Sequence, residues 1–186
     1  TTFFTIPSDD GAYNLPVIIT YPRNFDESKS YPVVMSIYGG PDAGTVRNTW
    51  KGTSSQYWAN EGVIQISCDH RASGHFGKKG VSLMHRNLGD WELVDYITVA
   101  KWLKAKPWVA KDKLLITGHS YGGYMTCLAL TKGSDYFDFG IAGAPVTGWE
   151  LYDTHYTERW MDTPQDNAEG YKKGSVLSYV DKYKGG

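Results

Sequence analysis

The chain has 186 residues, of which 41% are hydrophobic and 21% charged, a balance typical of one ordinary globular domain. Its formal net charge of −1 gives no reason to expect a nucleic acid or an anionic membrane surface as partner. No apolar run approaches the length that crosses a bilayer, and no signal-peptide pattern opens the sequence.

The first half of the chain alternates short apolar stretches with turn residues, which predicts strands. These strands are expected at residues 1–6, 15–21, 31–38 and 62–67. Residues 54–60 predict a short helix, and residues 69–80 a glycine-rich loop. A long helix is predicted over residues 88–104 and is ended by Pro107. It carries apolar side chains on more than one face, so we expect it to be covered on more than one side.

The second half repeats the alternation, with a strand at residues 113–117, a helix at 124–130 and a strand at 139–143. An aromatic segment with a partly helical pattern follows at residues 149–160. Strands that alternate with helices favour an α/β fold, with a mostly parallel sheet flanked by helices. The two cysteines are too few for a disulfide framework, so we expect buried free thiols.

Residues 118–122 read Gly-His-Ser-Tyr-Gly and match the G-x-S-x-G pattern of a nucleophile elbow. A predicted strand precedes the motif and a predicted helix follows it, which is the context that presents the serine on a strained turn. Gly118, Gly122 and Gly123 leave room for that turn, and the N-terminus of the helix favours negative charge beside Ser120. An ordinary glycine-rich turn is the alternative, but the flanking pattern favours Ser120 as a nucleophile.

A serine nucleophile needs a base, and the base needs an orienting carboxylate. In this arrangement the chain order is Ser, then Asp or Glu, then His. His155 is the single histidine after Ser120, and its aromatic surroundings favour a surface or packing role. The remaining histidines come before Ser120 and are out of order; they are His70, His75, His85 and His119. Because no strand-and-loop pattern for the acid precedes Gly186, we expect both acid and base beyond the last residue.

Two groups are candidates for stabilising the oxyanion of an acyl-transfer reaction. One is the backbone N–H of Tyr121, and the other is the hydroxyl of Tyr38, which ends a strand before a glycine pair. A tyrosine packed at a strand end is the alternative for Tyr38. Active sites of parallel sheets lie at the carboxyl ends of strands, where Tyr38, Ser120 and the residues after Ala142 would all fall.

Several spaced motifs in a fixed order carry a family resemblance. They are residues 38–41, 69–74, 118–124, 144–146, 149–150, 152–153 and 156–159. On these motifs, nearly the whole chain resembles the catalytic domain of the dipeptidyl peptidase IV branch of the prolyl oligopeptidase family. The departures are small: His119 stands where relatives often carry Trp, and Ala72 where many carry Gly.

The resemblance implies an α/β-hydrolase fold and a serine exopeptidase that releases N-terminal dipeptides after Pro or Ala through an acyl-enzyme on Ser120. It implies that the Tyr38 hydroxyl and the Tyr121 N–H hold the oxyanion. The pocket for the residue before the cut bond would be lined by Tyr121, Val146, Trp149, Tyr152 and Tyr156. Flat aromatic walls suit a compact, apolar proline ring. Glu158 and Arg159 are interpreted as a structural ion pair; without the family, the aromatic segment would be interpreted as core packing.

The same resemblance implies parts that these residues lack. Relatives carry the triad Asp and His in a segment that would follow Gly186, and an N-terminal β-propeller whose acidic residues bind the amino group of the substrate. Residues 1–186 would therefore form one partial α/β-hydrolase domain, incomplete at the C-terminus, and we expect negligible peptidase activity from it alone. No metal or cofactor is expected. Relatives often dimerise, and they are often periplasmic, secreted or membrane-anchored.

Two other classes of function remain as hypotheses. A lipase or carboxylesterase shares the elbow but needs a hydrophobic acyl channel in place of an aromatic proline pocket. A non-catalytic module would keep the fold without the chemistry, although Ser120 with its three glycines speaks against it. Release of dipeptides and release of tripeptides share these motifs, so the length of the product stays open.

Overall fold

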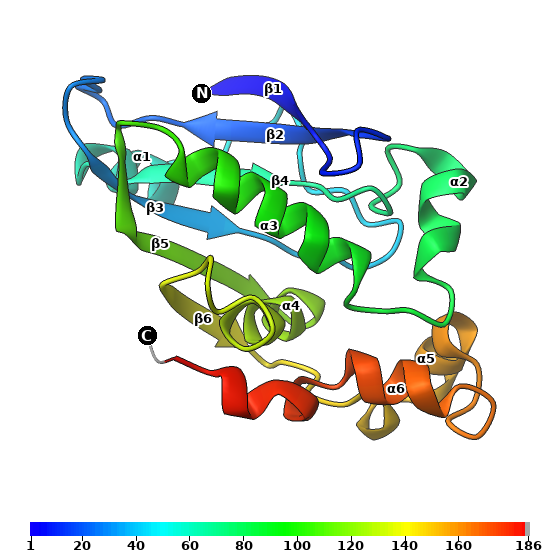
Figure 1. Ribbon diagram of the computed structural model, residues 1–186. Coiled ribbons are helices and arrows are strands. Elements are labelled where there is room, and N and C mark those ends of the chain that lie inside the picture. The colour runs from blue at the N-terminus through cyan, green and yellow to red at the C-terminus, as the bar shows by residue number, and fades with distance from the viewer. Residues whose placement is uncertain (185–186) are drawn as a thin grey trace.

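The structure is a computed structural model that describes residues 1–184 (Figure 1). Its centre is a six-stranded sheet with the order β1-β2-β4-β3-β5-β6. The strands are β1 (Thr2–Pro7), β2 (Asn14–Thr20), β3 (Tyr31–Ser36), β4 (Ile64–Cys68), β5 (Val109–His119) and β6 (Phe139–Gly143). The β1–β2 and β2–β4 pairs are antiparallel, while β3–β4, β3–β5 and β5–β6 are parallel. The predicted α/β class with a mostly parallel sheet is confirmed.

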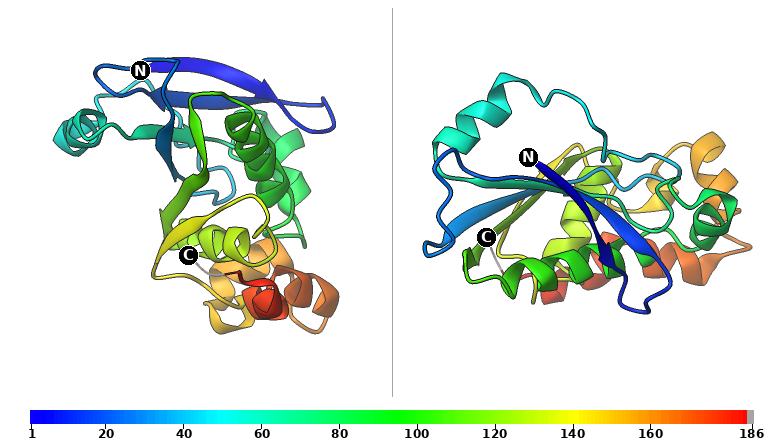
Figure 2. Two further views of the ribbon diagram at one scale, coloured as in Figure 1. Left: turned by 60° about the vertical axis from the view of Figure 1, so that its left-hand side comes forward. Right: turned by 90° about the horizontal axis from the view of Figure 1, so that it is seen from above.

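Helices cover the sheet unequally (Figure 2). The α-helices are α1 (Gly52–Asn60), α2 (Gly77–Val81), α3 (Trp91–Lys104), α4 (Tyr121–Leu130), α5 (Thr154–Met161) and α6 (Ala168–Gly174). Short 3₁₀ helices lie at η1 (Ser82–Met84), η2 (Trp149–Leu151) and η3 (Val176–Lys182). One face of the sheet carries α1, and the opposite face carries α3 and α4. The helices α5 and α6 gather beyond α4, toward the end to which β3 and β5 run.

The two central strands form the middle of the core. Val33 and Met35 of β3 and Leu114 and Ile116 of β5 are all buried, as expected of parallel strands covered on their faces. The register pairs Ser36, the last residue of β3, with Thr117, two residues before β5 ends at His119. The carboxyl ends of the two strands therefore present the following loops at one place.

The pattern did not predict α2, which lies mostly inside the expected glycine-rich loop, and it gave no prediction for α6 or η3. The five residues of α2 include two glycines and have low intrinsic helix propensity. Close packing explains the glycine at position 80, because a Cβ atom there would lie 2.1 Å from the backbone oxygen of Arg71. Strand β5 also begins at Val109, earlier than the expected residue 113, and α3 begins at Trp91 instead of residue 88.

Arg71 is a buried cation that ties three elements together. Its guanidinium contacts Asp95 of α3 and Asp10 of the β1–β2 turn, each at 2.7 Å. The ring of Trp91 lies 4.1 Å from the guanidinium carbon, and this stacking adds a cation–π contact. A buried arginine needs such partners, because an unpaired one would carry a large desolvation cost.

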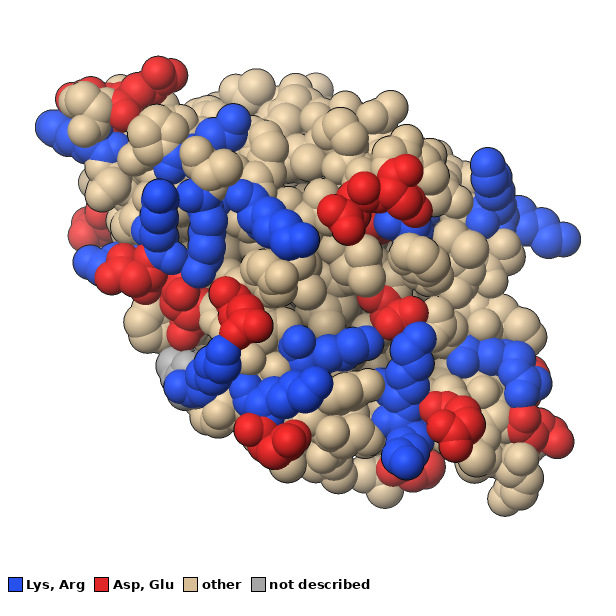
Figure 3. Space-filling model, in the orientation of Figure 1, with Lys and Arg blue, Asp and Glu red and all other residues tan. Residues whose placement is uncertain are grey.

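Acidic and basic side chains are interspersed on the face shown in Figure 3, so among the described residues this face has no extended basic surface. Within residues 1–184, no helix is both long enough and apolar enough to span a membrane. Both cysteines are free, as expected; Cys68 is buried and Cys127 half-buried.

Candidate active site

Ser120 lies on a strained turn between β5 and α4, as the G-x-S-x-G motif predicts. Its backbone has φ 59° and ψ −115°, a left-handed conformation that is rare for a residue with a side chain. The backbone N–H of Ser120 donates a hydrogen bond to the carbonyl oxygen of Gly143 (2.9 Å), and its own carbonyl accepts one from Tyr124 N–H (3.0 Å). The turn is thus held by both the neighbouring strand and the first turn of α4.

The glycines of the motif are required by close backbone packing. A Cβ atom at Gly118 or at Gly122 would lie 2.6 Å from the carbonyl oxygen of Ile37. A Cβ atom at Gly123 would lie 2.4 Å from the carbonyl oxygen of Gly143. Only glycine permits this approach of α4 to the two flanking strands.

Residues 38–41, which we call the Tyr38 loop, follow the carboxyl end of β3 and lie next to the elbow. Gly39 has φ 84°, and a side chain there would collide with the hydroxyl of Tyr96, 2.8 Å from its Cβ position. The carbonyl oxygen of Gly39 is bonded to His70 Nε2 (2.8 Å). Because Ala72 N–H donates to His70 Nδ1 (3.1 Å), the hydrogen of the ring is on Nε2, which donates to Gly39. His70 thus fixes the turn that follows Tyr38.

Aromatic rings extend from the elbow into the segment after β6. The ring of Tyr121 lies 6.2 Å from that of Tyr38 and 5.3 Å from that of Trp149. Trp149 in turn lies 6.1 Å from Tyr152 and 6.2 Å from Tyr156, the latter nearly parallel. These five rings form a continuous cluster, which we call the aromatic pocket cluster because four of them, all but Tyr38, are predicted to line the substrate pocket.

Burial differs across this cluster. Tyr121 and Trp149 are buried, Tyr156 is half-buried, and Tyr38 and Tyr152 are exposed. Val146, the remaining residue predicted to line the pocket, is partly buried against the hydrophobic core. Desolvation, with smaller contributions from Tyr38 and Tyr152, raises the pKa of Tyr156, so its hydroxyl is neutral at ordinary pH.

The structure places no histidine as the partner of Ser120. Within residues 1–184, no side chain forms a hydrogen bond with Ser120 Oγ. His155 is exposed on α5, where its Nε2 lies 2.8 Å from Arg159 Nη2. This contact replaces the expected ion pair of Glu158 with Arg159, because Arg159 faces one helical turn back. His75 is bound to Asp69 (2.7 Å), and no group of acidic, His or Cys side chains in the described part could hold a metal ion.

The sequence analysis gave no role to three residues whose hydrogen bonds hold parts of the site in place. They are His70 under the Tyr38 loop, Glu92 at the hydroxyl of Tyr121 (2.6 Å) and Tyr124 at the backbone of Gly174 (2.6 Å). Each belongs to a segment distant from Ser120 or points into the core, so no local pattern marks it.

Comparison with known protein families shows which of them share the sequence and fold of this chain. The model of the prolyl oligopeptidase family matches residues 49–185. The chain belongs to the prolyl oligopeptidase family. Within it, the chain is 43% identical over 166 residues to "Probable dipeptidyl-aminopeptidase B" of Arthroderma gypseum, and 41% identical to the protein of that name from Ajellomyces capsulatus. These matches support the predicted dipeptidyl peptidase IV branch of the prolyl oligopeptidase family.

Solved structures agree with the sequence relatives. The crystal structure of Porphyromonas gingivalis dipeptidyl peptidase 4 superposes on 99% of this chain with a TM-score of 0.94 and 36% sequence identity. This prolyl oligopeptidase chain therefore has the α/β-hydrolase fold that was predicted. It spans 18% of the length of these fungal relatives and 26% of that of the P. gingivalis enzyme.

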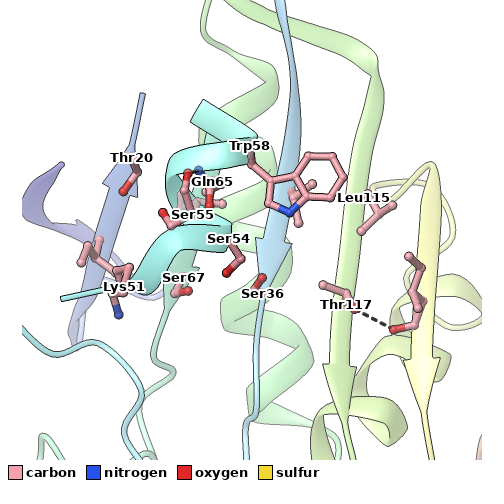
Figure 4. A pocket seen from close by; sticks show the side chains of 14 residues that line it. Thr20, Ser36, Lys51, Ser54, Ser55, Trp58, Gln65, Ser67, Leu115 and Thr117 are labelled. Carbon is pink, nitrogen blue, oxygen red and sulfur yellow. Dashed lines mark hydrogen bonds between the residues drawn. The ribbon is translucent and has the colours of Figure 1, made fainter. Parts of the chain in front are cut away.

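A separate cavity of about 440 Å³ lies on the other face of the sheet, under α1. Figure 4 shows Trp58 of α1 over this cavity, with Leu115 and Thr117 of β5 and Ser36 of β3 on its floor. None of its lining residues is a predicted site residue of this prolyl oligopeptidase chain. The cavity is therefore distinct from the elbow and its aromatic pocket cluster.

Proposed function

We propose that the protein containing this chain is a serine peptidase that releases N-terminal dipeptides after Pro or Ala through an acyl-enzyme on Ser120. The observation that carries this proposal is the strained Ser120 turn beside the aromatic pocket cluster. A strained serine at a strand–helix turn suits acyl transfer, and an aromatic cluster beside it suits a compact apolar side chain. The dipeptidyl peptidase names of the relatives support the same class of reaction.

In the proposed mechanism, Ser120 Oγ attacks the carbonyl carbon of the cut bond and transfers its proton to a base. The carbonyl oxygen becomes an oxyanion, which accepts hydrogen bonds from the Tyr121 N–H and the Tyr38 hydroxyl. The base then protonates the leaving amine, and water releases the dipeptide from Ser120 in a second attack. The N-terminus of α4 adds a partial positive charge next to this site.

Specificity would come from the aromatic pocket cluster and Val146. A proline ring fills a flat-walled, apolar pocket and loses no hydrogen bonds on burial. Alanine lacks part of that surface, so it would be accepted at a cost of about 1–3 kcal/mol. Val146, partly buried against the core, would contribute an aliphatic contact to the same pocket.

We also propose that the base and its carboxylate come from outside residues 1–186, in the order Ser, Asp, His. The supporting observation is that Ser120 Oγ has no side-chain partner within residues 1–184, while His155 is exposed and contacts Arg159. On this proposal the 186-residue chain is a partial domain with negligible peptidase activity. By the same resemblance, the full-length protein would be a homodimer that is periplasmic, secreted or membrane-anchored.

The test compares the 186-residue chain with the full-length protein on a chromogenic Gly-Pro substrate. We expect hydrolysis by the full-length protein, none by its Ser120→Ala variant, and at least a hundredfold less by the 186-residue chain. Equal rates for the two wild-type proteins would contradict the proposed source of the base.

A second substrate separates the alternative reactions. If the full-length protein cleaves short acyl esters but not the Gly-Pro amide, it is an esterase and the proposed specificity is wrong. If a fluorophosphonate does not label Ser120 in the full-length protein, the chain is a non-catalytic module.

A further inference from the structure

Glu92 lies in the first turn of α3, and its side chain is completely buried. Its Oε1 atom accepts hydrogen bonds from the Gly89 N–H (2.8 Å) and from the Tyr121 hydroxyl (2.6 Å). Its Oε2 atom is buried and has no hydrogen-bond partner within residues 1–184. Glu92 is thus a buried acid that the mechanism above does not use.

Helix capping accounts for only part of this arrangement. An acidic side chain in the first turn of a helix commonly accepts a hydrogen bond from a free backbone N–H, as Glu92 does from Gly89. Capping does not require burial, and burial disfavours the charged form and raises the pKa of Glu92, although His70 and the hydrogen bonds to the carboxylate act in the opposite direction. The bond from Tyr121 is the contact that the buried position adds.

Tyr121 connects Glu92 to the reaction centre. Its backbone N–H directly follows Ser120, and its ring is part of the aromatic pocket cluster. The ring packs edge-on against Tyr124 (5.4 Å) and lies 5.3 Å from the ring of Trp149. These contacts restrain the faces of the ring, while the bond to Glu92 restrains its far end.

We propose that Glu92 is a positioning residue that holds Tyr121, so that its ring forms a fixed wall for the proline and its N–H stays aimed at the oxyanion. The inference rests on the proposed function of Ser120. Glu92 itself does not touch the substrate. Loss of the bond would let the Tyr121 ring tilt, which widens the pocket and relaxes the discrimination between Pro and Ala.

Three substitutions in the full-length protein isolate this bond. Tyr121→Phe removes one oxygen atom and leaves the ring. Glu92→Leu removes the acceptor, while Glu92→Gln keeps an acceptor oxygen in nearly the same place. Glu61→Gln, an exposed acid at the end of α1, is the matched control. The kcat and KM are measured separately on a Gly-Pro and a Gly-Ala substrate.

We expect Tyr121→Phe and Glu92→Leu each to lower kcat/KM on the Gly-Pro substrate about tenfold and to lower the Pro-to-Ala ratio. Glu92→Gln should retain most of the activity, and the Glu92→Leu/Tyr121→Phe double variant should lose no more than either single variant. An unchanged Pro-to-Ala ratio in Tyr121→Phe, or additive losses in the double variant, would overturn the inference.

The rate of fluorophosphonate labelling of Ser120 separates this inference from the proposed function. If the wild-type protein is labelled but does not cleave the Gly-Pro substrate, the proposed specificity fails, and the inference is judged by labelling. The inference about Glu92 then predicts that Tyr121→Phe is labelled about tenfold more slowly than the wild type. Equal labelling rates for the two proteins would contradict the inference. A wild-type protein that is neither labelled nor active would refute both proposals.

Discussion

Gly122 sets how closely α4 approaches the Tyr38 loop. Its missing side chain leaves room for the carbonyl oxygen of Ile37, and the Cα atom of Tyr38 lies 3.2 Å from where a Cβ would stand. The left-handed conformation of Ser120 depends on this close packing, because the surrounding backbone must hold a strained residue in place. One methyl group at this position would therefore affect both stability and reactivity.

We expect Gly122→Ala to lower the free energy of unfolding by about 2–3 kcal/mol, since two backbone segments must move apart. Gly62→Ala is the control: it has a positive φ of 78° but no atom within 4 Å of the added methyl, so about 1 kcal/mol is expected. Thermal denaturation of the two variants measures the difference. Equal decreases in Tm for the two variants would contradict this prediction, because the contact with Ile37 would then add no cost to the Gly122→Ala substitution.

The β1–β2 turn is joined to α3 through Asp10, Arg71 and Asp95. Hydrogen bonds from Ser8, then from Arg71 and the Ala12 N–H, lower the pKa of Asp10 to about 2. The folded-state pKa is below that of the unfolded chain, so the ionised carboxylate stabilises the folded state above about pH 4. This contribution is lost as the pH falls from about 4 toward 2.

An Asp10→Asn variant should therefore be less stable than the wild type at pH 6, by no more than about 1 kcal/mol because water screens the half-exposed carboxylate. The difference should shrink as the pH falls below 4. Urea denaturation at pH 6, 4 and 2.5 measures it, with the exposed neighbour Asp9→Asn as control. A difference that grows at low pH would contradict the assigned sign.

Local pattern predicted the strands well where a buried strand reads as an apolar run. The stretch Leu114–Ile116 is an example of such a strand. The helix after Ser120 was also predicted, and the glycines around Ser120 indicated the elbow itself. Pattern failed for α2, whose glycine-rich residues predict a loop and whose Gly80 packs closely against the backbone of Arg71. The buried contact of Glu92 with Tyr121 could not be predicted either, because in sequence Glu92 resembles an ordinary acid at a helix start.

The described part of the molecule exposes apolar side chains on the less covered face of the sheet. Ile141 of β6 and Trp58 of α1 are 62% and 46% exposed, and both line the cavity under α1. An apolar surface of this kind on a single chain promotes self-association and the binding of hydrophobic dyes.

We expect the 186-residue chain to bind the dye ANS at neutral pH and to elute from size exclusion as more than a monomer. Ile141→Thr should reduce both signals, because it replaces an exposed apolar side chain by a smaller, polar one that is also β-branched. Thr53→Ser, an exposed and conservative change at the start of α1, is the control. A wild-type monomer without dye binding would contradict this prediction.

The pairing of β3 with β5 has a consequence for the proposed acyl transfer. Tyr38 and Ser120 follow neighbouring parallel strands in which Ser36, the last residue of β3, lies opposite Thr117 of β5, and Ile37 N–H donates to Thr117 O (2.9 Å). The distance between Ser120, the proposed nucleophile, and the Tyr38 hydroxyl, the proposed donor to the oxyanion, is thus set when these two strands pair. A slip of one residue would turn alternate side chains to the opposite face and remove the pair from register. The proposed reactivity depends on the alignment of these two strands. A refolding chain would therefore become competent for acylation only after β3 and β5 have paired in the correct register.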